Sequence, residues 1–107
     1  MRRTPADLLF DLHTKSYWLR EKRPVILDKK LSMDLMKWMY RNLKSKYYQM
    51  VKALYFQGKT MREAGEVLDR SRERVRQINN ISLRILRSAE KILELHKIIF
   101  GDKDGSL

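Results

Sequence analysis

Four polar residues follow one another at helical i, i+1, i+4 and i+5 spacing, so one exposed face of a helix carries them all. They are Arg72, Glu73, Arg76 and Gln77. An arginine can donate two hydrogen bonds to the O6 and N7 atoms of guanine, and a glutamine can pair similarly with adenine. A glutamate can accept a hydrogen bond from the amino group of cytosine. These residue types in this pattern predict base reading in the major groove of DNA.

The elements that must position these residues form a predicted helix-turn-helix. Thr60 and Glu63 have the spacing of a capping box, which predicts a short helix that ends near Leu68. A tight turn follows, and Ser71 caps a longer helix whose first turns carry the four residues. Two helices joined so closely cross at a steep angle, and a recognition helix enters the groove with its N-terminal turns.

Small and apolar residues form the predicted inner face of this unit. The expected core positions are Ala64, Val67 and Leu68 on the first helix and Val75, Ile78, Leu83 and Leu86 on the second. Ala64 and Gly65 are small where the two helices must approach each other. The second helix is expected to run beyond Glu90, because no glycine or proline interrupts it before Gly101.

The segment from Thr60 to Ile78 resembles region 4 of bacterial primary sigma factors. Its run Ser71 to Ile78, S-R-E-R-V-R-Q-I, matches the family's helix-turn-helix pattern throughout. The resemblance covers about Met50 to Leu93, under half of the chain. It implies an all-α fold and a recognition helix that reads the −35 element of a promoter.

The resemblance implies the same four base readers as the side-chain chemistry, and it implies backbone contacts for Thr60 and Arg74. Arg70 replaces an aliphatic residue, so it either removes a core contact or adds a phosphate contact. Asn79 and Asn80 follow on the helix, and one of the two is expected to reach a phosphate or a base edge. We assign Asn80 to the DNA backbone. Because the family's region 4 also docks on the flap of the RNA polymerase β subunit, polymerase is a partner that the resemblance alone implies.

Several positions depart from the family pattern. Asp69 stands where glycine is common, and aspartate tolerates the left-handed conformation, so the turn is expected to form. Ala64 replaces a larger aliphatic residue, and Tyr55 stands near the place of a family arginine. The first 45 residues do not resemble a region that binds the −10 element. We therefore expect a stand-alone region 4-like regulator rather than a complete sigma factor.

The composition favours an anionic partner. The 107 residues carry a net charge of +11, and nucleic acid is the usual partner of such a surplus. An anionic membrane surface or an acidic protein is the alternative, and the charge can also serve solubility alone. Among these partners we expect double-stranded DNA. No stretch approaches the roughly 20 apolar residues of a membrane span, and the N-terminus lacks the apolar region of a secretory signal. We expect a cytoplasmic protein without membrane association.

No residue pattern predicts catalysis. The chain has no cysteine, and neither His13 nor His96 has metal-ligand spacing. It also lacks a Ser/His/Asp set, a glycine-rich phosphate loop and paired carboxylates on an apolar wall. We expect no enzyme activity, no cofactor and no metal.

Helical signals also fill the flanks, and no alternating strand pattern is present. Thr4 caps an expected first helix that runs to about Arg20, before a connector over residues 21–30. Ser32 and Ser45 are the expected caps of two further helices, and Gly58 is expected to end the second of these. We divide the chain into an N-terminal helical segment that packs on the core (1–45), a helix-turn-helix domain (46–100) and a frayed tail (101–107).

The C-terminal helix is apolar on more than one side, so we expect it to be covered on more than one side. N-terminal helices with Trp18, Trp38 and Met39 can cover it, or a homodimer can form through it. The six methionines either fill the core or line an adaptable groove. 

Three functions are consistent with these patterns. The first is a sequence-specific DNA-binding transcription regulator. The second is an RNA polymerase-binding modulator that uses the region 4-like module mainly for protein interaction. The third is a structured RNA-binding protein, although the sequence offers no aromatic platform on which bases stack.

Overall fold

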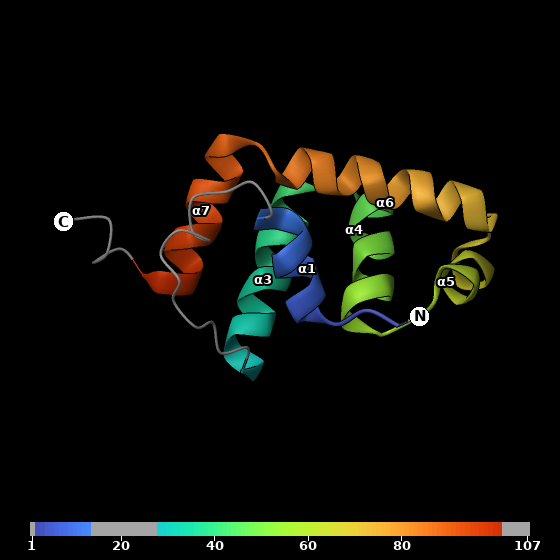
Figure 1. The fold of residues 1–107 in the computed structure, drawn as a ribbon, viewed down its shortest axis with the longest axis horizontal. Helices are drawn as coiled ribbons and strands as arrows, with labels where there is room; N and C mark the ends of the chain where they lie inside the picture. Colours follow the sequence, from blue (N-terminus) through green and yellow to red (C-terminus); the bar gives the residue numbers. More distant parts are fainter. Residues whose placement is uncertain (1, 14–27, 102–107) are drawn as a thin grey trace.

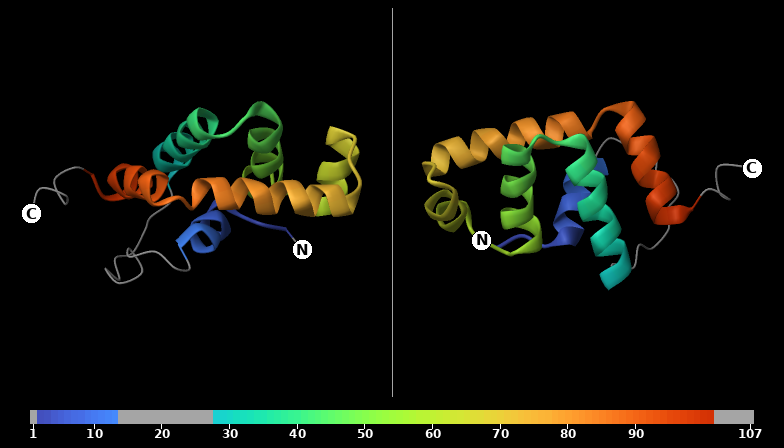
Figure 2. Two further views of the ribbon diagram at one scale, coloured as in Figure 1. Left: turned by 90° about the horizontal axis from the view of Figure 1, so that it is seen from above. Right: turned by 180° about the vertical axis from the view of Figure 1, so that it is seen from behind.

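The computed structural model describes residues 2–13 and 28–101, and within these ranges the chain is helical without a strand. The elements are α1 (Pro5–His13), α3 (Lys29–Asn42), α4 (Ser45–Val51), the π-helical turn η1 (Lys52–Phe56), α5 (Met61–Leu68), α6 (Arg72–Leu86) and α7 (Ala89–Phe100). Figure 1 shows α6 along one side of the molecule, with α5 at one end and α7 at the other. Seen from above in Figure 2, α1 lies on one side of α6, and α3 and α4 lie on the other. The predicted all-α class is confirmed.

Thr4 caps α1, as predicted, and Asp7 pairs with it. The backbone N–H of Asp7 donates to Thr4 Oγ1 at 3.3 Å, and the backbone N–H of Thr4 donates to Asp7 Oδ2 at 2.8 Å. The predicted helix end near Arg20 and most of the predicted connector lie outside the described residues. So do Trp18 and all but the first residue of the predicted tail.

The prediction that Ser32 caps the next helix is wrong. α3 begins at Lys29 because the carboxylate of Asp28 accepts a hydrogen bond from the backbone N–H of Leu31 at 2.8 Å. Aspartate is at least as favourable at this position as serine, so the earlier residue sets the helix start. Ser32 and the last two residues of the predicted connector lie inside the helix.

The prediction for the cap of the third helix is also wrong, by one residue. Lys44 occupies the N-cap position without a side-chain hydrogen bond, and Ser45 is the first helical residue. After Val51 the helix widens into η1, which no residue pattern predicted. Gly58 follows with a φ of +64°, so its predicted role at the end of this helix is confirmed.

The last helix does not run uninterrupted past Glu90, contrary to the prediction. α6 ends at Leu86, and α7 begins at Ala89 and packs against α3. Ile92 and Leu95 of α7 are buried in this packing. The burial of apolar side chains outweighs the local preference for an unbroken helix.

A continuous core joins the described helices. Trp38 and Met39 of α3 are fully buried in it together with Leu95 of α7, so α3 covers the apolar side of α7. Leu93, on the opposite side of α7, is 51% exposed. None of the helices in the described ranges is long and apolar enough to span a bilayer.

Candidate nucleic-acid interface

The start of α5 is held by a capping box, as predicted. Thr60 Oγ1 accepts a hydrogen bond from the backbone N–H of Glu63 at 3.1 Å, and Glu63 Oε1 accepts one from the backbone N–H of Thr60 at 2.9 Å. Arg2 adds two hydrogen bonds to the same carboxylate. The hydrogen bonds from Arg2, followed by that from the Thr60 backbone, lower the pKa of Glu63 to about 2. Glu63 is therefore ionised throughout the neutral range.

Gly65 and Asp69 allow the tight turn between α5 and α6. Asp69 adopts the left-handed conformation with a φ of +55°, as its residue type predicted. The carbonyl oxygen of Gly65 accepts a hydrogen bond from the backbone N–H of Arg70 at 2.8 Å. A Cβ atom on Gly65 would lie 2.4 Å from the carbonyl oxygen of Arg70, which is closer than real Cβ contacts come. The turn thus requires glycine at this position.

The inner face of the helix-turn-helix agrees with the prediction except at one residue. Ala64 on α5 and Val75, Ile78, Leu83 and Leu86 on α6 are buried, and Leu68 is half-buried. Val67 is 64% exposed, so its predicted place in the core is wrong. At about 100° per residue, Ala64, Gly65 and Leu68 share a face, and Val67 points roughly a quarter turn away from it.

The predicted recognition face lies on the first turns of α6. Ser71 caps the helix, with its Oγ accepting a hydrogen bond from the backbone N–H of Arg74 at 3.1 Å. The four predicted base readers, Arg72, Glu73, Arg76 and Gln77, are all exposed. In Figure 1 these first turns lie at the α5 end of the molecule, away from α7. No other described helix covers the face, so it is sterically free to meet a DNA groove.

Side chains on this face are paired with one another. Arg76 donates from both Nε and Nη2 to the carboxylate of Glu73, and Arg74 Nη1 donates to Gln77 Oε1 at 3.2 Å. The hydrogen bonds between Arg76 and Glu73 lower the pKa of Glu73 and raise the pKa of Arg76. Both groups stay charged near neutral pH, and each limits the rotamers of the other.

Comparison with known families identifies this unit. The family model for region 4 of sigma-70 matches residues 42–88 of the chain. Residues 42–88 form a sigma-70 region 4 domain. Region 4 is a helix-turn-helix family that binds DNA in transcription and is not an enzyme family, so the predicted family and fold are confirmed. No curated protein and no solved structure matched the chain.

The matched range differs slightly from the predicted one. The sequence resemblance was placed at about residues 50–93, whereas the region 4 match begins at residue 42 and ends at residue 88. The match therefore includes all of α4 and stops at the break between α6 and α7. α7 and the helices before α4 lie outside the matched region 4 domain.

The residues assigned to the DNA backbone flank the recognition face of the region 4 domain. Arg70, Arg74 and Asn80 are exposed, and Thr60 is half-buried at the start of α5. Asn79, the neighbour that was not assigned to the backbone, is 4% exposed and cannot reach DNA. The structure thus separates the two asparagines, while the backbone contacts themselves stay a prediction.

A polar network fastens α1 to the region 4 domain, and sequence analysis missed it. Tyr55 in η1 donates a hydrogen bond to Asp11 Oδ2 of α1 at 2.7 Å, and Asn79 Nδ2 donates to the Tyr55 hydroxyl at 3.4 Å. Arg87 donates two hydrogen bonds to the carbonyl oxygen of Asp11. Burial raises the pKa of Tyr55 to about 12, so its hydroxyl stays a donor.

Proposed function

We propose that the protein is a sequence-specific transcription regulator that reads a promoter-like DNA element with α6. The observation that carries this proposal is the exposure of Arg72, Arg76 and Gln77 on the first turns of a capped recognition helix. Those turns are the part of a helix-turn-helix that enters the major groove. The arginine side chains can donate hydrogen bonds to the acceptor atoms of guanine, and the glutamine side chain can pair with adenine.

Phosphate contacts would fix the register of α6 in the groove. Thr60 and Arg70 lie at the two ends of α5, and Arg74 and Asn80 lie on α6 beside the base readers. In helix-turn-helix docking the first helix crosses the DNA backbone while the second lies in the groove. The net charge of +11 supports this arrangement, because phosphate neutralisation supplies much of the affinity for DNA.

Replacing Arg76 or Gln77 with alanine should relax sequence preference. Each lost bidentate base contact costs about 1–3 kcal/mol of discrimination, which corresponds to roughly 5- to 160-fold in the affinity ratio. Random-site selection with the parent gives the target, and fluorescence anisotropy with target and unrelated duplexes gives the ratio. A −35-like consensus is expected.

Arg84→Ala is the matched control, because Arg84 is an exposed arginine in the last turn of the same helix. It should lower affinity for both duplexes without changing their ratio. If Arg76→Ala and Gln77→Ala keep the parental ratio, α6 does not read bases.

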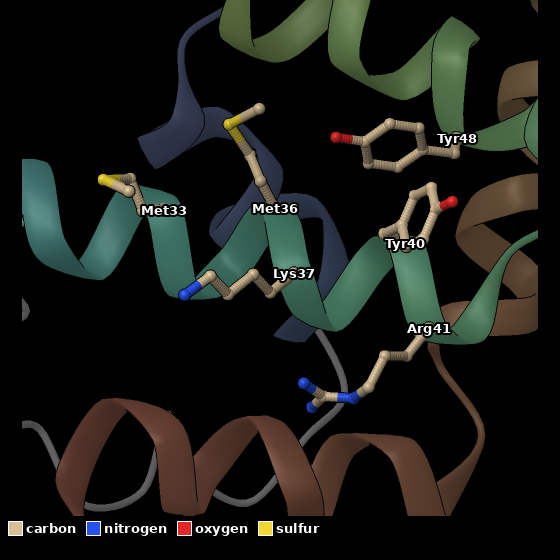
Figure 3. A pocket seen from close by; sticks show the side chains of 6 residues that line it. All are labelled: Met33, Met36, Lys37, Tyr40, Arg41 and Tyr48. Carbon is tan, nitrogen blue, oxygen red and sulfur yellow. The ribbon is translucent and has the colours of Figure 1, made fainter.

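A groove between α3 and α4 favours a second candidate function, binding to RNA polymerase. Figure 3 shows the groove with Met33, Met36 and Tyr40 of α3 and Tyr48 of α4 along it. It encloses about 480 Å³, and Met33 and Tyr40 are 49% and 69% exposed. The methionines thus divide between the two predicted roles, since Met39 and Met50 are core residues. Lys37 borders the groove and favours an acidic polymerase segment, such as one on the β flap, whereas the neighbouring Arg41 is already paired with Glu94.

Tyr40→Ala should weaken retention of RNA polymerase by about tenfold, since exposed aromatic residues at the centre of an interface are typical binding hot spots. DNA binding should not change, because α3 lies away from the recognition face. A pull-down with polymerase and anisotropy with DNA measure the two activities. Phe10→Ala, at a 63% exposed aromatic of α1, is the control. Unchanged retention by Tyr40→Ala would exclude this groove, and failure of the parent to retain polymerase would end the second candidate.

The other predicted partners stay predictions. A homodimer through the C-terminal helix would have to use the exposed side of α7 around Leu93, because Ile92 and Leu95 are already buried against the same chain. A palindromic site from the random selection would indicate such a dimer. Competition between duplex DNA and RNA at fixed salt would distinguish DNA binding from the RNA-binding alternative.

A further inference from the structure

Arg2 lies against the start of α5, although 61 residues separate it from Glu63 in sequence. Its Nη1 donates to Glu63 Oε1 at 2.7 Å and to the carbonyl oxygen of Gly58 at 2.8 Å, and its Nη2 donates to Glu63 Oε2 at 3.1 Å. Arg3 follows with its guanidinium 5.9 Å from the centre of the Tyr55 ring. Residues 2–4 are thus fixed along the region 4 domain, and Figure 1 shows the N-terminus near the chain that enters α5.

This position places a cation where the DNA backbone would pass. The first helix of a docked helix-turn-helix crosses the backbone, and Thr60, adjacent to the Arg2 contacts, is a proposed phosphate contact. Glu63 is ionised at the same place, and an unpaired carboxylate there would repel phosphate. A guanidinium has five N–H donors, and the three hydrogen bonds of Arg2 use three of them. The Arg2 side chain is 62% exposed, so the remaining donors can reach an external group.

We propose that Arg2 is a further DNA-backbone contact, which donates to a phosphate oxygen beside Thr60 while it cancels the charge of Glu63. The inference rests on the proposed function, because it needs DNA to lie along the start of α5. It assigns to the segment before α1 a part in DNA binding that the helix-turn-helix pattern alone does not contain. Arg2 would add affinity without sequence preference, since phosphates carry no base information.

Arg2→Ala tests the contact directly. The salt slope of DNA binding, log K against log salt concentration, should become shallower by about 0.9, which extrapolates to roughly eightfold weaker binding at 0.1 M salt. The loss should be equal for the selected and the unrelated duplex. Glu63→Gln should bind both duplexes more tightly than the parent, because it removes a charge that repels phosphate and keeps an oxygen for the Thr60 backbone.

The Arg41–Glu94 pair provides a matched control. Its Nη2–Oε1 distance is 2.6 Å, and its side chains are 56% and 43% exposed, against 62% and 42% for Arg2 and Glu63. It joins α3 to α7, at the other end of the molecule from α5 (Figure 1). Arg41→Ala and Glu94→Gln therefore make the same charge changes far from the proposed interface. Their effects should stay within about twofold, because charges beyond roughly 10 Å are screened at 0.1 M salt.

Binding by Arg2→Ala that matches Arg41→Ala in affinity and salt slope would overturn the inference. Thermal unfolding followed by circular dichroism checks that Arg2→Ala is folded. If it is not, Arg2→Gln decides, because glutamine lacks the charge but keeps N–H donors for Glu63 and Gly58. A salt slope shallower than that of Arg41→Ala supports the contact, and an equal slope refutes it. The proposed function fails separately, when the parent itself binds selected and unrelated duplexes equally. Arg2→Ala and Arg41→Ala are compared on each duplex separately, so the result for Arg2 does not depend on whether the parent prefers one duplex.

Discussion

Gly65→Ala should lower the free energy of unfolding by roughly 3 kcal/mol, the upper end of what overpacking costs, and should strongly weaken DNA binding. The added Cβ atom would lie 2.4 Å from the carbonyl oxygen of Arg70 and 3.4 Å from Val75 Cγ2. The closest neighbour is backbone in the turn, so relief requires the turn to open rather than a side chain to rotate. An opened turn moves α6 relative to α5. Urea denaturation measures the stability, and anisotropy with target DNA measures the binding.

Gly58→Ala is the control for this prediction. Gly58 has a φ of +64°, but no atom lies within 4 Å of a Cβ built on it. Alanine at this position should lower the free energy of unfolding only by the left-handed strain, about 1–2 kcal/mol. The folded variant should still bind DNA. If both variants lose the same stability and retain DNA binding, the close approach of the Arg70 carbonyl oxygen does not explain the glycine at position 65.

The parts of this fold that sequence analysis predicted correctly are those that local chemistry decides. The capping box at Thr60, the cap at Ser71 and the left-handed residues Gly58 and Asp69 each depend on residues within one turn of the chain. The wrong predictions divide into two kinds. Ser32 is not the cap because Asp28, an equally favourable cap residue four positions earlier that was assigned to no helix, begins α3. The break after Leu86 has only a weak local signal, because Ser88 occupies the N-cap of α7 without a side-chain hydrogen bond, and the break accompanies the packing of α7 against α3.

The candidate site divides in the same way. Helical spacing predicted which side chains of α6 share an exposed face, and the structure shows Arg72, Arg76 and Gln77 exposed there. Spacing could not separate Asn79 from Asn80, because the two differ only in what packs over them. The contacts of Arg2 join a residue outside the matched range to Gly58 and Glu63 inside it, more than 50 residues further along the chain. No pattern within a single helix contains information about such contacts.

Leu95→Ala should destabilise the whole protein, including the region 4 domain, by about 2–5 kcal/mol. Leu95 is fully buried and lies in α7, outside the range that the family model matches. The core that it joins also contains Trp38, Leu86 and Val75, which connect α3 to the recognition helix. Truncation leaves a cavity in that shared core. Urea denaturation followed by far-ultraviolet circular dichroism measures the loss.

Leu93→Ala provides the control on the same helix, since Leu93 is 51% exposed and its truncation should change stability by less than about 0.5 kcal/mol. Both tryptophans of the chain precede residue 46, so their fluorescence reports on the proposed N-terminal segment, whereas circular dichroism reports on all helices. Coincident transitions by the two probes, both shifted by Leu95→Ala, are expected if α3 and α7 fold as one unit with the region 4 domain. If the fluorescence transition shifts while most of the circular dichroism transition does not, the helix-turn-helix is instead stable without α3 and α7. The flanking helices would then be an attachment to the DNA-binding domain rather than part of its core.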